Sequence, residues 1–161
     1  MSRGPARVRE VHIDYVGSAA IAGSLGNVHL AVYRGELTAE TLTRVHDAHL
    51  SLLAERAPTV VFSLAEEGTP LPGAEVRDLA TRFGNEVAPR IRCSAQVLLG
   101  SGFWVSAARS FLTAILLVRQ VDYPMKICSE VSEAARFVEV RNPGGPSSLE
   151  LERAVATLRR T

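Results

Sequence analysis

The chain has 161 residues, which fits one domain with a short appendage, and 47% of them are apolar, enough for a core without metals or disulfides. The net charge of +1 argues against a nucleic-acid-binding protein and against attachment to an anionic membrane. The chain starts without the apolar core of an export signal, and its longest apolar stretch, residues 103–118, is too short and polar to cross a bilayer, so we expect a soluble cytoplasmic protein.

The order of apolar residues predicts strands and helices that alternate after a flexible N-terminal arm at residues 1–10. Alternating or β-branched apolar runs predict strands, the first with a break at Val16-Gly17, at residues 11–23, 28–33, 59–64, 95–99 and 124–128. Apolar stripes of helical period predict helices at residues 38–56, 76–87 and 103–120. A short fourth helix ends at Val138 and is expected to begin at a cap provided by Ser129 or Ser132.

Turn and cap signals indicate how the domain is organised. Gly26-Asn27 favours a tight hairpin turn, because both residue types tolerate positive φ. Residues 141–147 form a Pro/Gly linker, and a capping box at its end begins a tail helix over residues 148–161. We therefore expect residues 11–140 to form one α/β domain: a mixed sheet with an N-terminal hairpin, about four helices packed on it, and the C-terminal tail helix.

Two features of the composition indicate the cellular setting. Cys93 and Cys128 are expected near the start of one strand and the end of another, too far apart for a disulfide, so both should be free thiols. Lys126 is the only lysine among the 18 basic residues. Such a preference for arginine is typical of a high-GC bacterial genome, so the sequence favours a bacterial cytoplasm.

Three short patterns resemble catalytic or metal-binding motifs, and each lacks a necessary partner. Gly100-Ser101-Gly102 has neither the third glycine of a dinucleotide fingerprint nor the lysine of a P-loop, and predicts a tight turn. His46 and His49 share one side of a helix, but a zinc site needs a third ligand, so we expect partly buried, hydrogen-bonded histidines. Glu66-Glu67 is typical of a solvated acidic turn. We therefore predict no catalytic residues, metal or cofactor.

Three segments carry a family resemblance: Tyr33–Thr38, Val60–Leu64 with the loop and helix that follow, and Ile127–Ala135. Together they resemble the STAS domain of anti-sigma-factor antagonists and stressosome components, over about residues 17–138. The resemblance implies a STAS-like sheet and a regulatory, protein-binding role. The antagonist branch carries Asp-Ser-Ser-Gly, with a phosphorylated serine, before its second helix, whereas this loop reads Gly-Thr-Pro-Leu-Pro-Gly. The resemblance therefore points to a divergent branch, with Thr69 as the one candidate regulatory phosphosite.

The expected helix at residues 103–120 carries more apolar surface than docking on a sheet requires. Its apolar residues sweep an arc of about 200°, whereas a stripe of about 100° is enough for one docked face. Three explanations fit this excess apolar surface. Neighbouring helices cover it, it contacts another protein or a second copy of the chain, or it lines an apolar ligand pocket. For the second case, the predicted partner-binding residues are Trp104, Val105, Ala108, Leu112, Ile115 and Leu116.

These observations favour a non-enzymatic protein-binding or regulatory module of STAS-like type that acts through this third helix. The partner would be a protein of unknown identity or a second copy in a homodimer, and neither a nucleic acid nor a membrane. The alternative is a small-molecule or lipid carrier, because Sec14-type lipid-binding domains have a related α/β architecture. An enzyme of unknown type, based on the glycine turn and the histidines, is the least favoured of the three.

Overall fold

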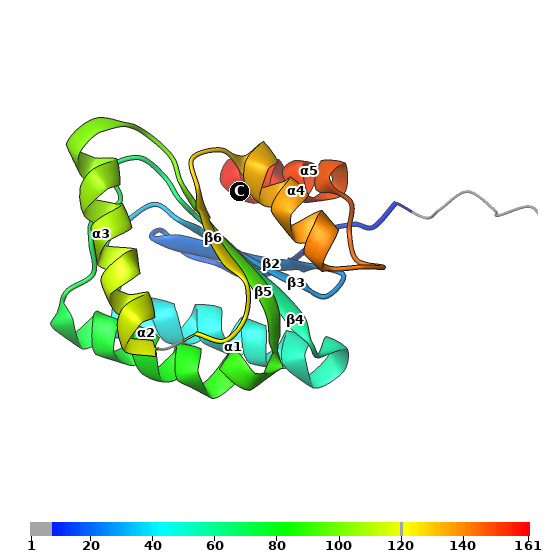
Figure 1. Cartoon of the computed structure of the whole chain (residues 1–161), viewed down its shortest axis with the longest axis horizontal. Coiled ribbons are helices and arrows are strands. Elements are labelled where there is room, and N and C mark those ends of the chain that lie inside the picture. Colours follow the sequence, from blue (N-terminus) through cyan, green and yellow to red (C-terminus); the bar gives the residue numbers. More distant parts are fainter. Residues whose placement is uncertain (1–7, 120) are drawn as a thin grey trace, which may run out of the picture.

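The six strands lie in one mixed sheet in the same order as in the chain. A computed structural model describes residues 8–119 and 121–161 (Figure 1). The first three strands are antiparallel, and the third to sixth run parallel. The strands are β1 (His12–Val16), β2 (Ala20–Leu25), β3 (Val28–Tyr33), β4 (Thr59–Ala65), β5 (Ile91–Leu98) and β6 (Met125–Cys128). This is the expected α/β fold with an N-terminal hairpin.

The helices cover both faces of this sheet. Three crossovers join successive parallel strands in the same direction, and right-handed crossovers of that kind place their helices on one face. These helices are α1 (Ala39–Arg56), α2 (Ala74–Val87) and α3 (Gly102–Arg119). The other face carries α4 (Val131–Arg141) and α5 (Ser148–Arg160), and Figure 1 shows the sheet between the two groups. A short 3-10 helix, η1 (Ala88–Arg90), leads from α2 into β5.

The main core lies between the sheet and the helices α4 and α5. Every second residue of β3, β4 and β5 points to this side, as the strand period of two requires. The tail helix contributes Leu151, Val155 and Leu158, all almost fully buried against β2, β3 and α4. The helix therefore docks on its own sheet. No helix in the described part of the chain is long and apolar enough to span a membrane.

Most local signals in the sequence correspond to observed features. The chain breaks after Val16 as expected, where the amide of Gly17 donates to the carbonyl of Ala20 at 2.9 Å. Gly26 has a φ of 58° in the hairpin turn between β2 and β3. The expected capping box is present, because the Ser147 hydroxyl accepts from the Glu150 amide and the Glu150 carboxylate accepts from the Ser147 amide.

The expected serine cap of α4 is wrong. The helix begins between the two candidates, so that Ser129 lies before it and Ser132 lies inside its first turn. Glu130 occupies the N-cap position without a side-chain capping bond, and its carbonyl accepts from the Ala134 amide at 3.3 Å. Most of the expected N-terminal arm, residues 1–7, lies outside the described residues. Next to it, Arg9 is held on the tail helix by Glu150, with 3.3 Å between guanidinium and carboxylate.

Candidate ligand-binding site

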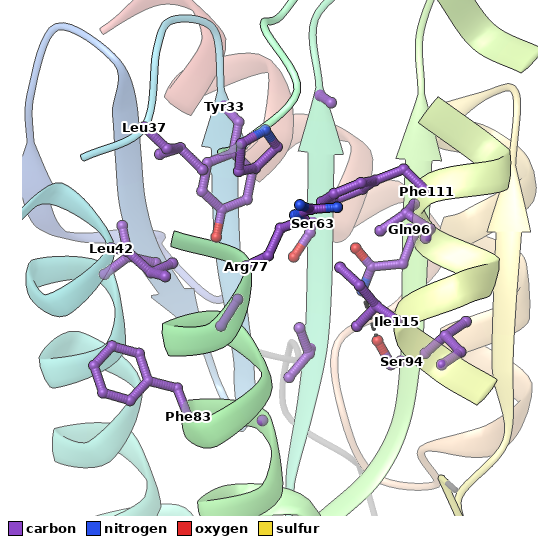
Figure 2. Close-up of a pocket in the computed structure, with 18 of the residues that line it drawn as sticks. Tyr33, Leu37, Leu42, Ser63, Arg77, Phe83, Ser94, Gln96, Phe111 and Ile115 are labelled. Atoms are coloured by element: carbon purple, nitrogen blue, oxygen red, sulfur yellow. Dashed lines mark hydrogen bonds between the residues drawn. The ribbon is translucent and has the colours of Figure 1, made fainter. Parts of the chain in front are cut away.

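A cavity of about 290 Å³ lies between the sheet and the helices α1, α2 and α3. Its floor is the face of β3, β4 and β5 opposite the main core, and α2 and α3 form its walls (Figure 2). The floor carries short side chains, among them Ser63, Ala65 and Ser94. Because α3 packs chiefly on α2 and β5, it does not fill the space above these short side chains. In Figure 1, α3 accordingly stands at a steep angle to α2.

The floor of the cavity is polar at its centre. Ser63 on β4 is in register with Gln96 on β5, and the Gln96 amide nitrogen donates to the Ser94 hydroxyl at 2.8 Å. Figure 2 shows Ser94 and Gln96 together on their strand, with Ser63 beside them on β4. Sequence reasoning missed Ser63 and Gln96 because the two expected strands were interpreted as uniformly apolar runs, and the polar residues inside those runs were the available signal. It missed Ser94 because the expected strand began at residue 95, whereas β5 begins at Ile91.

Aliphatic and aromatic side chains surround this polar floor. On α2 they include Val76, Ala80 and Phe83, and on α3 they include Phe111 and Ile115. The mixture of apolar walls with a few hydrogen-bonding groups is typical of small-molecule sites.

The six predicted partner-binding residues mostly face the cavity. All of them except Val105 line it, and Ala108 is buried while the other five are half-buried. The outer side of α3 carries Phe103 and Leu117, which are 90% and 75% exposed, with polar or small residues between them. The wide apolar arc of α3 thus faces the cavity. That the six residues bind a protein partner stays a prediction.

The loop after β4 closes the cavity at the carboxyl ends of the strands. The indole nitrogen of Trp104 donates to the Thr69 carbonyl at 2.9 Å, which ties the start of α3 to this loop. The Thr69 hydroxyl is buried and donates to the Glu66 carbonyl at 2.6 Å. Phosphorylation of Thr69 stays a prediction, and a kinase would have to open this loop to reach the hydroxyl.

Among the described residues, two arginines supply all the formal positive charge of the lining. Arg77 extends from α2 toward α3, with its guanidinium carbon 6.0 Å from the centre of the Phe111 ring (Figure 2). Arg119, at the end of α3, donates from Nη2 to the Tyr123 hydroxyl at 3.2 Å. Its Nε is buried and has no acceptor among the described residues. No aspartate or glutamate of the described chain lines the cavity.

Three histidines line the edge of the cavity, two of them on α1 and the third on β3. His46 is joined to the Glu86 carboxylate at 3.0 Å, and His49 is joined to the Thr59 hydroxyl at 2.8 Å. Both side chains are buried, which confirms the expected hydrogen-bonded histidines. His29 stacks on His49 with 4.5 Å between ring centres. Burial lowers the pKa of His49 to about 4 and that of His29 well below its usual value.

The glycines and Glu66 of the short sequence patterns have structural roles. Gly100 and Gly102 have φ angles of 111° and 72° in the expected tight turn into α3. Glu66 is not simply solvated, because Arg159 binds its carboxylate through two hydrogen bonds of 2.6 and 2.9 Å.

Both cysteines are free, as predicted, and burial raises the pKa of Cys93 to about 11. Cys128 is in register with Val97, four residues along β5 from Cys93.

Comparisons of the chain with protein-family models, with curated proteins and with solved structures find no match. No match identifies the chain as a STAS domain, and the fold agrees with the STAS resemblance only at the level of an α/β protein with a mixed sheet.

Proposed function

We propose that the protein binds a small, largely apolar molecule in the cavity between its sheet and α3. The cavity itself carries this proposal, because its walls are apolar and its floor offers hydrogen-bonding groups on Ser63, Ser94 and Gln96. A protein fold normally fills such a space, since interiors pack as densely as organic crystals. This role corresponds to the small-molecule or lipid carrier that the sequence suggested as an alternative. The α/β architecture shared by STAS-like and Sec14-type domains is compatible with it.

The size of the cavity limits the ligand. An engineered apolar cavity of about 150 Å³ holds one benzene molecule in another protein. The volume here, about 290 Å³, is roughly twice as large. It would accept a ligand of roughly ten to fifteen non-hydrogen atoms by that comparison. A fatty chain of medium length or a two-ring aromatic molecule has this size.

Trp104 offers a direct test, because it is the only tryptophan in the chain and it lines the cavity. We expect added 1-octanol to shift its fluorescence emission to shorter wavelength in a saturable manner, since an apolar chain would displace water beside the indole. Native mass spectrometry would show the matching one-to-one complex. An emission spectrum unchanged by octanol, together with an unliganded mass, would contradict the proposal.

The protein-binding role remains a second proposal, favoured by the exposed Phe103 and Leu117 on the outer side of α3. The two proposals assign different roles to Trp104, which lines the ligand cavity in the first and contacts a protein partner in the second. If Trp104 serves the cavity, the mass measured by light scattering at high concentration should be the same for the wild type and Trp104→Ala. A dimer in the wild type that is lost in Trp104→Ala would favour the protein-binding role instead.

A further inference from the structure

In the described part of the chain, the formal charges of the cavity lining are all positive. Arg77 and Arg119 line it, and no carboxylate of the described residues lines it or pairs with either guanidinium within 4.0 Å. We propose that the ligand is a carboxylate-bearing amphiphile whose carboxylate binds Arg119. This inference rests on the proposed function and adds the chemical class of the ligand.

Arg119 is held in place before any ligand arrives. One end of its guanidinium is fixed by the bond from Nη2 to the Tyr123 hydroxyl. The guanidinium also lies on the bare backbone of Gly84 in α2, where even a methyl group would collide with it. A preorganised guanidinium loses little side-chain freedom when it binds an anion, so its hydrogen bonds contribute more to affinity.

The same guanidinium lacks an anionic partner. Its Nε is shielded from water and has no acceptor among the described residues, and a buried donor without a partner destabilises the unliganded protein. Arginine matches a carboxylate with two parallel hydrogen bonds, and such charge-assisted bonds are about twice as strong as neutral ones. A carboxylate would therefore supply the negative charge that this part of the lining lacks.

Arg77 has a different place. Arg77 is exposed to solvent, and its guanidinium lies near the Phe111 ring between α2 and α3. A positive charge there raises the local concentration of anionic ligands without a desolvation penalty. The apolar body of the ligand would then lie against α2 and α3, above the short side chains of β4 and β5.

Octanoate and octanamide test this inference, because they share one alkyl chain and differ in charge. We expect octanoate to bind roughly 10-fold more tightly than octanamide at pH 7.5, measured by calorimetry and by Trp104 emission. Equal affinities would overturn the anionic ligand while leaving the cavity as a binding site. If neither compound binds, the proposed function fails together with the inference.

Variants of two arginines on α3 separate the role of Arg119 from general charge. Arg119→Gln should weaken octanoate binding roughly 10-fold and leave octanamide binding within about twofold. Arg119→Lys keeps the charge but not the two parallel hydrogen bonds, so its octanoate affinity should lie between those of the wild type and Arg119→Gln. Arg109→Gln is the matched control, because Arg109 is exposed outside the cavity on the same helix, and it should bind octanoate like the wild type.

Circular dichroism would verify that each variant is folded. Loss of octanoate binding in Arg109→Gln as well, or no loss in Arg119→Gln, would overturn the assignment to Arg119. A parallel loss of octanamide binding in Arg119→Gln would show that the residue only supports the structure.

Discussion

Replacing Ala108 with leucine is expected to weaken ligand binding strongly while the protein stays folded. Ala108 is 4% exposed and lines the cavity from α3. Its side chain would gain three carbon atoms, which would occupy the space proposed for the ligand. We expect calorimetry to show a loss of 1-octanol affinity of about 100-fold, equivalent to about 2.7 kcal/mol.

The stability of the same variant distinguishes a cavity from a filled core. In a filled core, extra methylene groups cost about 1–3 kcal/mol because neighbouring side chains must move. In an open apolar cavity they are buried without collision, and each can contribute up to about 0.8 kcal/mol. We therefore expect the free energy of unfolding of Ala108→Leu, measured with urea, to equal or exceed that of the wild type.

Ala114→Leu is the control for this experiment. It makes the same change on the same helix at an exposed position that does not line the cavity. Its octanol affinity should match the wild type. If Ala108→Leu binds octanol normally, or if it is destabilised as a filled core would be, the cavity is not the binding site.

The sequence predicts most of the fold because its signals are local. The break after Val16, the turn at Gly26 and the capping box at Ser147 each depend on a few adjacent residues. The α/β class then follows from the alternation of strands and helices. The wrong cap of α4 shows the limit, since two serines on either side of Glu130 offer equally good local signals.

The cavity depends on residues that are distant in the chain. Ser63 and Gln96 become neighbours only through the register of β4 with β5, and a shift of one residue in that register would put the two side chains on opposite faces of the sheet. The apolar arc of α3 does show in the sequence as surplus apolar surface. Periodicity alone cannot tell whether that surplus meets a partner, a neighbouring helix or a hollow. The short side chains opposite α3 decide between these cases, and only the fold places them there.

Acid should destabilise the protein through the stacked pair His29 and His49. Burial is the main cause of both lowered pKa values, and the neighbouring His46 lowers them further. Arg90 adds a smaller contribution at His49. In the unfolded chain each imidazole takes up a proton near pH 6.5, whereas folded His49 does so near pH 4. As the pH falls through this window, the unfolded state binds more protons, so stability decreases, and the contribution of His49 levels off below about pH 4.

Urea unfolding at pH 7 and pH 5 would measure this loss. His49 contributes about 1.4 kcal/mol per pH unit where only the unfolded state is protonated, so this residue alone should cost about 2 kcal/mol between these two pH values. His29, whose pKa is also lowered, adds to the loss. His49→Gln, which can still bond to the Thr59 hydroxyl, should remove about 2 kcal/mol of the loss. His12→Gln is the control, because His12 is exposed on β1, and it should leave the loss unchanged. An equal loss in His49→Gln and the wild type would assign the acid sensitivity to other groups.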